Sequence, residues 1–241
     1  MMKTFLKRVC GFTLVEMAVV LVIMGLLIAG LLGPLSAQVD QKNYSQVRKG
    51  LEDAKEALIG YSLSNKHLPC PDKVAGANNG VNDRPNDGIE DFNSLTGTCI
   101  TPEGNLPWAT LSLPARDPWE QALIYRVTPA FSQRQVLPLN SFNLSSNGVL
   151  RICNEAACNV PRLTDTAVAV IVSKGKNIGN CSTVPSPPAC ADERANDDNN
   201  NDFVSHDPTV TTSPNGEYDD AIVWLSSNIL VNRMVAAGQL P

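Results

Sequence analysis

An apolar run from Phe12 to Leu35 limits what this chain can fold into more than any other feature. The run holds 24 residues and a single charge, Glu16. A helix that crosses a bilayer takes about 20 apolar residues, whereas the apolar core of a cleaved secretory signal takes only about 7 to 15. The run therefore predicts a transmembrane helix that stays attached to the rest of the chain.

Three basic residues, Lys3, Lys7 and Arg8, come before the apolar run. Positive charges beside a membrane segment tend to remain in the cytoplasm. We therefore expect a cytoplasmic N-terminus, a single membrane pass, and export of everything after about residue 36.

The residues that follow the run predict a continuing helix with one apolar face. Apolar positions recur at alternating steps of three and four residues: Tyr44, Val47, Leu51, Ala54, Leu58 and Tyr61. This spacing is typical of an amphipathic helix that packs on a partner. Gly33-Pro34 is the strongest breaker, and we expect Pro34 to kink the helix without ending it. One helix from about Thr13 to Ser64 would be about 78 Å long at 1.5 Å per residue, so its first half should project from any small domain.

The N-terminal stretch "GFTLVEMAVVLVIMGLLIAGLL" resembles the N-terminus of type IV pilins and of type II secretion pseudopilins. The resemblance rests on a short basic leader that ends in Gly11, then Phe12, then Glu16 as the fifth residue after that junction. It implies that prepilin peptidase cleaves between Gly11 and Phe12 and that the new Phe12 amine is methylated. It also implies that Glu16 pairs with the Phe12 ammonium of a neighbouring subunit during assembly.

Physical chemistry supports this role for Glu16. A carboxylate near the middle of a bilayer costs on the order of 2.5 to 3.5 kcal/mol and usually marks function. Opposite charges attract strongly in a medium of low dielectric constant, and an unpaired one is penalised. Glu16 is therefore predicted to set the axial register between subunits, whereas a plain signal anchor would leave the charge unexplained.

The resemblance weakens after about residue 64. The stretch "LPWATLSLPARDPWEQALIYRV", residues 106–127, resembles a segment of the major pseudopilins, but Glu120 replaces a glycine and Ala122 replaces a proline. The stretch "EYDDAIVWL", residues 217–225, resembles their acidic C-terminal segment with a different spacing. These likenesses favour a secretion pseudopilin or a related minor pilin, and they leave the choice between a pilus and a secretion system open.

The chain is expected to have four parts. These are a leader (1–11), the transmembrane half of the long helix (12–35), its amphipathic half (36–64) and a periplasmic globular domain (65–241). At 241 residues, two compact exported domains are not expected.

The exported part predicts an α+β fold. Turn-forming residues dominate from 65 to about 105, which predicts a long loop. Strands are expected at 122–128, 148–154 and 166–173, in a small antiparallel sheet packed on the amphipathic half of the long helix. A last helix should start at a cap formed by Ser226 or Ser227 and should stop at Gly238.

Cysteine usage indicates an oxidising compartment. Of the seven cysteines, Cys10 would leave with the leader, so six would remain in the exported part. An even number in an exported chain predicts disulfides, and loop closure favours near neighbours. The expected pairs are Cys70–Cys99, Cys153–Cys158 and Cys181–Cys190. Zinc binding is the competing interpretation, but neither His67 nor His206 stands at zinc-finger spacing from a cysteine pair.

Two acidic loops offer oxygen ligands for calcium, which takes six to eight. The first loop carries Asp83, Asp87, Glu90 and Asp91, and the second carries Asp197, Asp198 and Asp202 and is joined by Asp219 and Asp220. Major secretion pseudopilins hold calcium near their C-terminal acidic segment, so the resemblance singles out Asp219 and Asp220, with Asp198 and Asp202 beside them. Composition alone favours solvated loops over a metal site.

The sequence therefore predicts a structural subunit, a minor pilin or pseudopilin of a type IV pilus or type II secretion filament. Its expected partners are other pilins or pseudopilins, prepilin peptidase, and the inner membrane with its assembly platform. A net charge of −5 gives no reason to expect nucleic-acid binding. The alternative is a calcium- or glycan-binding tip module on such a filament. A membrane-tethered periplasmic enzyme is the weakest hypothesis, because no nucleophile and base stand in a recognisable motif.

Overall fold

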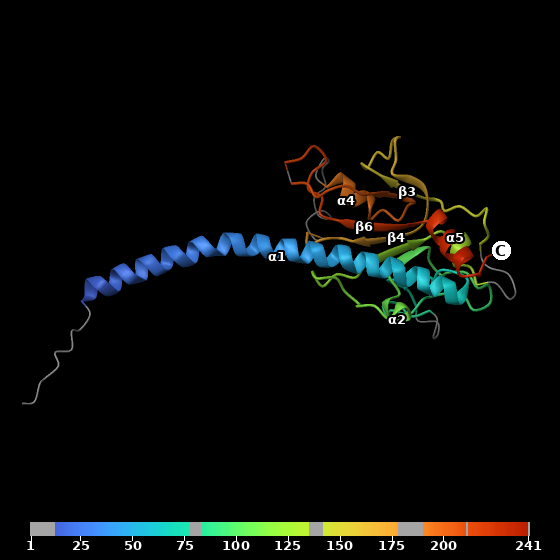
Figure 1. Ribbon diagram of the computed structural model, residues 1–241, viewed down its shortest axis with the longest axis horizontal. Coiled ribbons are helices and arrows are strands. Elements are labelled where there is room, and N and C mark those ends of the chain that lie inside the picture. Colours follow the sequence, from blue (N-terminus) through green and yellow to red (C-terminus); the bar gives the residue numbers. More distant parts are fainter. Residues whose placement is uncertain (1–12, 78–82, 135–141, 178–189, 211, 241) are drawn as a thin grey trace, which may run out of the picture. The chain divides into compact units, whose positions relative to one another are not determined.

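The computed structural model describes residues 13–77, 83–134, 142–177, 190–210 and 212–240, and the side chains of residues 29–37 lie outside this description (Figure 1). The chain divides into two compact units, Met1–Ser45 and Gln46–Pro241.

A single helix, α1 (Leu14–Asn65), contains 52 residues and confirms the expected long helix almost to the residue. It continues through Gly33 and Pro34 without an interruption in its helical assignment.

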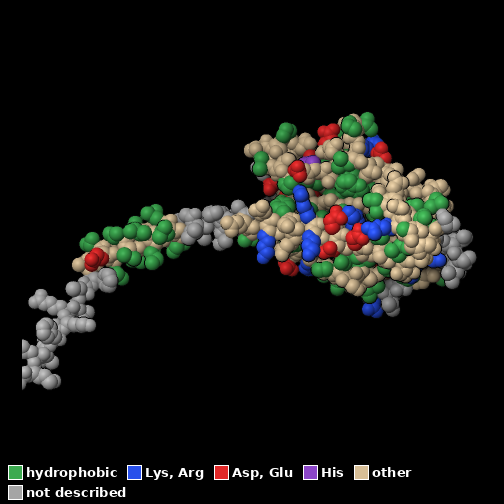
Figure 2. Space-filling view, viewed as in Figure 1, with side chains coloured by type: hydrophobic (Ala, Val, Ile, Leu, Met, Phe, Trp, Pro, Cys, Tyr) green, Lys and Arg blue, Asp and Glu red, His purple; other side chains and the backbone are tan. Residues whose placement is uncertain are grey.

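Exposed apolar side chains dominate the first part of α1, from Leu14 to Ile28. From Leu14 to Ile28 the large apolar side chains are between 46 and 86 % exposed, and Figure 2 shows this segment green on all visible sides. Apolar side chains all round a helix are typical of a segment that other helices or lipid will cover. Within the described residues, no helix contains an apolar stretch of the length that a membrane crossing needs.

The part of α1 in the second unit buries one face, as its period predicts. Val47, Leu51, Ala54 and Leu58 are almost wholly buried. They join the main core, which also holds Val223 and other side chains from one face of the sheet. Figure 1 shows this half of α1 lying along the sheet next to β4.

The sheet has six strands among the described residues. They are β1 (Glu103–Asn105), β2 (Ile124–Val127), β3 (Leu150–Cys153), β4 (Thr164–Ser173), β5 (Asp202–Val204) and β6 (Ala221–Ser226). The order is β1-β2-β4-β3-β5, and β6 pairs with β4. Ala167 of β4 pairs with β3 on one side and with β6 on the other. Ala169 pairs with β2 on one side and again with β6 on the other. β2 and β3 therefore lie along one edge of β4, and β6 lies along the opposite edge.

The central strand β4 is buried from Ala167 to Ser173. A continuous apolar run is typical of a strand covered on both faces. On the face away from α1, Val170 and Val172 form a second cluster with Ile152 and Phe203, against which Trp224 is packed. The protein is therefore α+β, with a sheet covered on both sides in this region.

The structure corrects the expected sheet in two respects. The expected strands contain β2, β3 and β4, but β1, β5 and β6 were not expected as strands. β1 ends the region 65–105 that was expected to be loop, and β5 lies in the second acidic loop. The sheet is mixed and not purely antiparallel, because β3 and β5 pair in parallel. β1 and β5 were missed because a strand of three residues is too short to show an alternating pattern in the sequence.

Four further helices complete the described structure: α2 (Trp108–Leu111), α3 (Pro129–Ser132), α4 (Ala191–Ala195) and α5 (Ser227–Ala236). The structure confirms the predicted cap of α5, because the Ser226 hydroxyl accepts a 3.3 Å hydrogen bond from the amide of Ile229. Leu230 and Met234 are buried, and Gly238 has a positive φ of 68° beyond the helix end.

Two disulfides join Cys70 to Cys99 and Cys153 to Cys158, which are two of the three expected pairs. The third expected pair includes Cys181, which lies outside the described residues.

Candidate functional sites: the N-terminal segment and a buried carboxylate cluster

The start of α1 is closed by a capping box between Thr13 and Glu16. The amide and the hydroxyl of Thr13 each donate a 2.8 Å hydrogen bond to Glu16 Oε2. In return the amide of Glu16 donates to the Thr13 hydroxyl oxygen at 3.2 Å. These bonds satisfy amide groups that a helix start would otherwise leave without partners.

Glu16 therefore has a role inside its own chain before any neighbour is present. Its carboxylate is held in the first turn of the helix, where the helix dipole favours negative charge. The T-x-x-E spacing in "TLVE" carries the signal for this capping box in the sequence. Gly11 and Phe12 lie outside the described residues, so the expected pairing of Glu16 with a neighbour's Phe12 stays a prediction.

The second candidate site is a buried cluster of three carboxylates, Glu193 from α4 with Asp219 and Asp220 directly before β6. One oxygen from each lies within 4.8 Å of the others. The three residues are 7, 3 and 6 % exposed, respectively. Burying one carboxylate is costly unless it is paired or protonated, and burying three together is more so.

Amide groups from neighbouring segments hold the cluster in place. Glu193 Oε1 accepts from Asn177 Nδ2 at 3.1 Å and from the amide of Asp219 at 2.7 Å. Asp220 Oδ2 accepts from Asn196 Nδ2 at 2.8 Å. These contacts orient Glu193 and Asp220 without neutralising their charge.

Asp219 is the least satisfied member of the cluster. Its Oδ2 accepts from the amide of Lys176 at 3.1 Å, while its buried Oδ1 has no hydrogen-bond partner among the described residues. Gly175 lies against this oxygen, and a Cβ at that position would be 2.0 Å from Asp219 Oδ1. Gly175 also has a φ of 61°, which glycine adopts without strain. The backbone at Gly175 therefore lies closer to the Asp219 carboxylate than a residue with a Cβ would allow.

Burial is the main cause that raises the pKa of all three carboxyl groups. The pKa of Glu193 rises to about 7 and that of Asp219 to about 6, and nearby carboxylates add to both shifts. The pKa of Asp220 is raised well above its usual value, again mainly by burial and then by Glu193 and Asp219. Such a group of oxygens can be balanced either by protons or by a hard cation such as calcium.

The structure gathers only part of the predicted metal-ligand set. Asp219 and Asp220 belong to the cluster, but Asp202 pairs with Arg151, with 2.5 Å between Arg151 Nη2 and Asp202 Oδ2. Asp198 is exposed and accepts from Asn200 Nδ2 at 2.6 Å, and Asp197 pairs with Lys174. Glu193 was not predicted, because the chain brings it to Asp219 from 26 residues away and no local spacing signals that contact.

The first acidic loop uses its carboxylates to hold its own backbone. Asp91 accepts from the amides of Lys73 and Arg84 at 2.8 and 2.9 Å. Asp87 accepts from the amide of Ile89 at 2.9 Å, and Asp83 pairs with Lys73. These contacts favour a structural role for the loop.

Glu90 and the two histidines also have structural contacts. Glu90 accepts from the Tyr61 hydroxyl at 2.5 Å and from the amide of Cys70 at 3.1 Å, and it pairs with Arg134. His67 Nδ1 lies 2.9 Å from the carbonyl oxygen of Leu68. His206 lies against Tyr218 and reaches Asp192 at 3.2 Å.

Comparison with known protein families decides the nature of the N-terminal segment. The prokaryotic N-terminal methylation motif matches residues 6–32. The chain carries the type IV pilin and pseudopilin signature. This pilin signature covers residues 6–11, the Gly11–Phe12 junction, the capping box and the first part of α1. It implies assembly with other pilins and a membrane-anchored or filamentous location. Comparison with curated proteins and with solved structures gives no match.

Proposed function

We propose that this protein is a structural subunit, a minor pilin or pseudopilin, of a type IV pilus or a type II secretion filament. The observation that carries the proposal is the methylation motif at residues 6–32, placed at the start of a 52-residue helix. The exposed apolar side chains from Leu14 to Ile28 support it, because helices of neighbouring subunits would cover them.

In this proposal each part of the chain has one task. Residues 1–11 are removed by prepilin peptidase, and the new amine of Phe12 is methylated. Residues 12–35 anchor the subunit in the inner membrane with a cytoplasmic N-terminus and later pack in the filament. Residues 36–64 join the anchor to the periplasmic domain 65–241, whose core contains the buried face of α1. The assembly platform extracts the subunit from the membrane into the filament.

Mass spectrometry of the N-terminus tests the proposal in cells that contain prepilin peptidase. The wild-type chain should begin at methylated Phe12, and Gly11→Ala should retain the leader. Gly25→Ala is a matched control, because a Cβ added at Gly25 meets nothing within 4 Å and the site lies outside the leader. A wild-type chain that keeps residues 1–11, or that is absent from isolated filaments, would overturn the proposal.

The carboxylate cluster supports a second function, calcium binding in the periplasmic domain. We propose Asp219, Asp220 and Glu193 as ligands, because three buried carboxylates come together and Asp219 Oδ1 lacks a hydrogen-bond partner among the described residues. Calcium bound there would neutralise the cluster and hold α4 against the start of β6. The ion would stabilise the subunit and would take no part in a chemical step.

Thermal unfolding of the full chain tests this binding after chelation and then with calcium or magnesium. A ligand at about 100 times its dissociation constant adds about 2.7 kcal/mol, which raises the Tm of a domain of this size by several degrees. Asp219→Asn should abolish the rise, whereas the exposed Asp198→Asn should keep it. The same Tm with and without calcium in the wild-type chain would argue against the site.

A further inference from the structure

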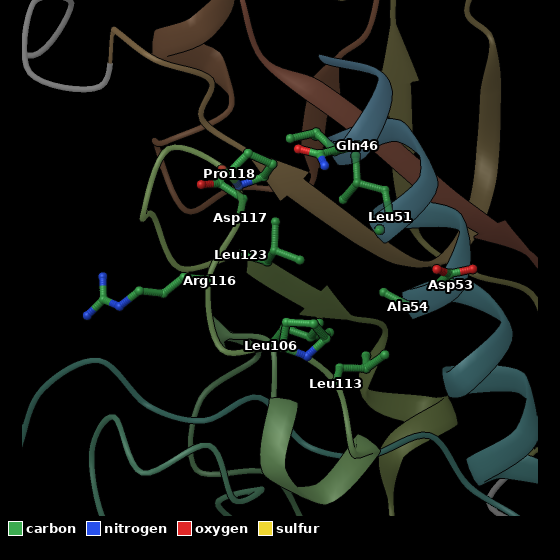
Figure 3. Close-up of a pocket in the computed structure, with 13 residues that line it drawn as sticks. Gln46, Leu51, Asp53, Ala54, Leu106, Leu113, Arg116, Asp117, Pro118 and Leu123 are labelled. Atoms are coloured by element: carbon green, nitrogen blue, oxygen red, sulfur yellow. The ribbon is translucent and has the colours of Figure 1, made fainter. Parts of the chain in front are cut away.

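Two pockets of similar size in the second unit have different linings. Leu51 and Ala54 of α1 line the first, of about 380 Å³, on one side, and Leu106 and Leu123 line it on the other (Figure 3). Leu51, Ala54 and Leu106 are only 1 to 3 % exposed, so this apolar pocket belongs to the main core. The second pocket has a volume of about 360 Å³ and is lined mainly by polar side chains. It is called the polar pocket below.

The register of the sheet determines where the polar pocket lies. Asn105 of β1 pairs with Ile124 of β2, which pairs with Val172 of β4. Val172 belongs to the apolar cluster on the face of the sheet away from α1. Glu103 precedes Asn105 by two residues, and side chains two residues apart on a strand point to the same face. Glu103, Asn105 and Ile124 therefore form the floor of the polar pocket on the face away from α1.

The loop after α4 supplies another wall of the polar pocket through Asp197 and Asn199. Lys174, directly after β4, also lines the pocket and pairs with Asp197. The buried guanidinium of Arg126 donates from Nη1 to Asn199 Oδ1 at 2.6 Å and to Glu103 Oε2 at 3.0 Å. Arg126 thus ties the loop to the floor, and the second acidic loop is held by basic side chains.

Five polar side chains of the pocket each use one atom in a bond within the protein and keep a second atom without a partner among the described residues. Glu103 uses Oε2 and Asp197 uses Oδ1, which leaves one carboxylate oxygen on each. Asn199 uses Oδ1 and keeps Nδ2. Asn105 Nδ2 and Gln121 Nε2 donate to neighbouring oxygens at 2.7 and 3.2 Å, which leaves both amide oxygens. Side chains that are held in place before a ligand arrives reduce the entropy cost of binding it.

This lining favours an uncharged ligand with several hydroxyl groups. An anion would meet Glu103 and Asp197, whereas an organic cation would meet Lys174. Within the described part of the chain, these two carboxylates belong to no group of three side chains that could hold a metal ion. A hydroxyl group both donates and accepts hydrogen bonds, so it can bind a carboxylate, an amide or an ammonium group. The volume is within the range of small-molecule sites, about 300 to 1,000 Å³.

We propose that the polar pocket binds a saccharide. The hydroxyl groups of the sugar would take the remaining atoms of the polar side chains, and Ala122 and Ile124 would contact the apolar face of a sugar ring. Asp197 and Asn199 are exposed, so the pocket is reached from solvent without a change in the core. The inference goes beyond the proposed filament function and does not depend on it.

Saturation-transfer NMR on the full-length chain tests the site, with a chelator present and in a detergent whose head group is not a sugar. The probes are glucose, galactose, N-acetylglucosamine and the β-1,4-linked tetramer of N-acetylglucosamine, with glycine as a zwitterionic comparison. At least one saccharide should bind saturably. Ala122→Trp, which fills the pocket from its half-buried rim, should weaken this binding at least tenfold, equivalent to about 1.4 kcal/mol. Ala236→Trp, at the exposed end of α5, is the matched control and should leave the affinity unchanged.

Asp197→Asn and Asp198→Asn form a second matched pair, because both residues are exposed and only the first of them lines the pocket. Asp197→Asn should weaken the binding about tenfold, since a hydrogen bond to a charged group is lost, and Asp198→Asn should not. Thermal unfolding shows whether each variant is folded.

The inference is overturned if no saccharide binds, if glycine alone binds, or if neither Ala122→Trp nor Asp197→Asn weakens the binding relative to its control. Tighter binding of the tetramer than of N-acetylglucosamine would indicate a polymeric glycan as the ligand, and equal affinities would indicate a single sugar unit; both support the site. A chain that loses its leader and enters filaments but binds no saccharide overturns this inference alone.

Discussion

The amide of Asp219 donates a 2.7 Å hydrogen bond to Glu193 Oε1, which brings together two acidic residues that are 26 positions apart in the chain. With Asp220 they form a group of carboxyl oxygens that is almost completely buried. The free energy of this arrangement depends on whether protons or a cation balance the charge.

The stability of the metal-free protein should fall as the pH rises from about 4 to about 7. In the unfolded chain these groups titrate near pH 4, whereas in the folded chain the pKa of Glu193 is about 7 and that of Asp219 about 6. The folded state therefore binds more protons in this window, and its extra stability is lost as the pH passes through the folded pKa values. Urea unfolding in the presence of a chelator measures the slope, and Glu193→Gln should make it shallower. With calcium present the loss should shrink or reverse, since only the ionised carboxylates are good ligands.

Gly175→Ala should destabilise the protein more than Gly238→Ala. Both glycines have positive φ, and a side chain in the left-handed region costs about 1 to 2 kcal/mol. At Gly238 an added Cβ meets nothing within 4 Å, but at Gly175 it would be 2.0 Å from Asp219 Oδ1. Gly175→Ala should therefore also remove the calcium-dependent rise in Tm, which Gly238→Ala should keep. Equal losses of stability for the two variants would contradict the close approach at Gly175.

Two substitutions should separate the capping role of Glu16 from its role in assembly. Glu16→Gln keeps a residue that completes a capping box but removes the charge, whereas Thr13→Ala removes the hydroxyl that caps the Glu16 amide and keeps the charge. If the charge sets subunit register, Glu16→Gln should enter filaments poorly and Thr13→Ala should enter them nearly as well as the wild type. Quantitative immunoblots of isolated filaments measure this, with leader removal as the control. If Thr13→Ala enters filaments poorly and Glu16→Gln enters them well, Glu16 is important for assembly because it caps the helix and not because it is charged.

Glu90→Ala should cost much more stability than Glu56→Ala. The Glu90 side chain is 6 % exposed, and its loss leaves the Tyr61 hydroxyl and the amide of Cys70 without their acceptor, at about 1 to 3 kcal/mol for each buried group left unpaired. The side chains of the Glu56–Arg233 pair are 58 and 57 % exposed, so that pair contributes about 0 to 1 kcal/mol. Urea unfolding at neutral pH measures both variants. A loss for Glu90→Ala as small as that for Glu56→Ala would show that the network around Tyr61 contributes little.

The sequence predicted correctly those elements that have a long periodic or apolar pattern or a recognisable cap. The uninterrupted period from Tyr44 to Tyr61 and the apolar run before it predicted α1. The continuous apolar residues of β4 predicted the central strand, and Ser226 with Gly238 predicted α5. In each case the residues that determine the element lie within the element or beside it.

The features that sequence reasoning missed depend on contacts between distant segments. The parallel pairing of β3 with β5 joins two short strands separated by β4 and α4, and neither strand carries a signal for its partner. Glu193 becomes part of the carboxylate cluster only because α4 lies beside the start of β6. The T-x-x-E spacing of Thr13 and Glu16 is a sequence signal for a capping box, but Glu16 was interpreted only as an assembly residue.

The arrangement of strands around β4 also determines when the sheet can be completed during synthesis. β2 and β3 precede β4 in the chain, so one edge of β4 can pair as soon as Ser173 has been made. The other edge waits for β6, which follows α4 and β5. An unpaired apolar edge is a template for strands of other chains. The interval between the appearance of Ser173 and that of Ala221 is therefore when the growing polypeptide is most exposed to mispairing.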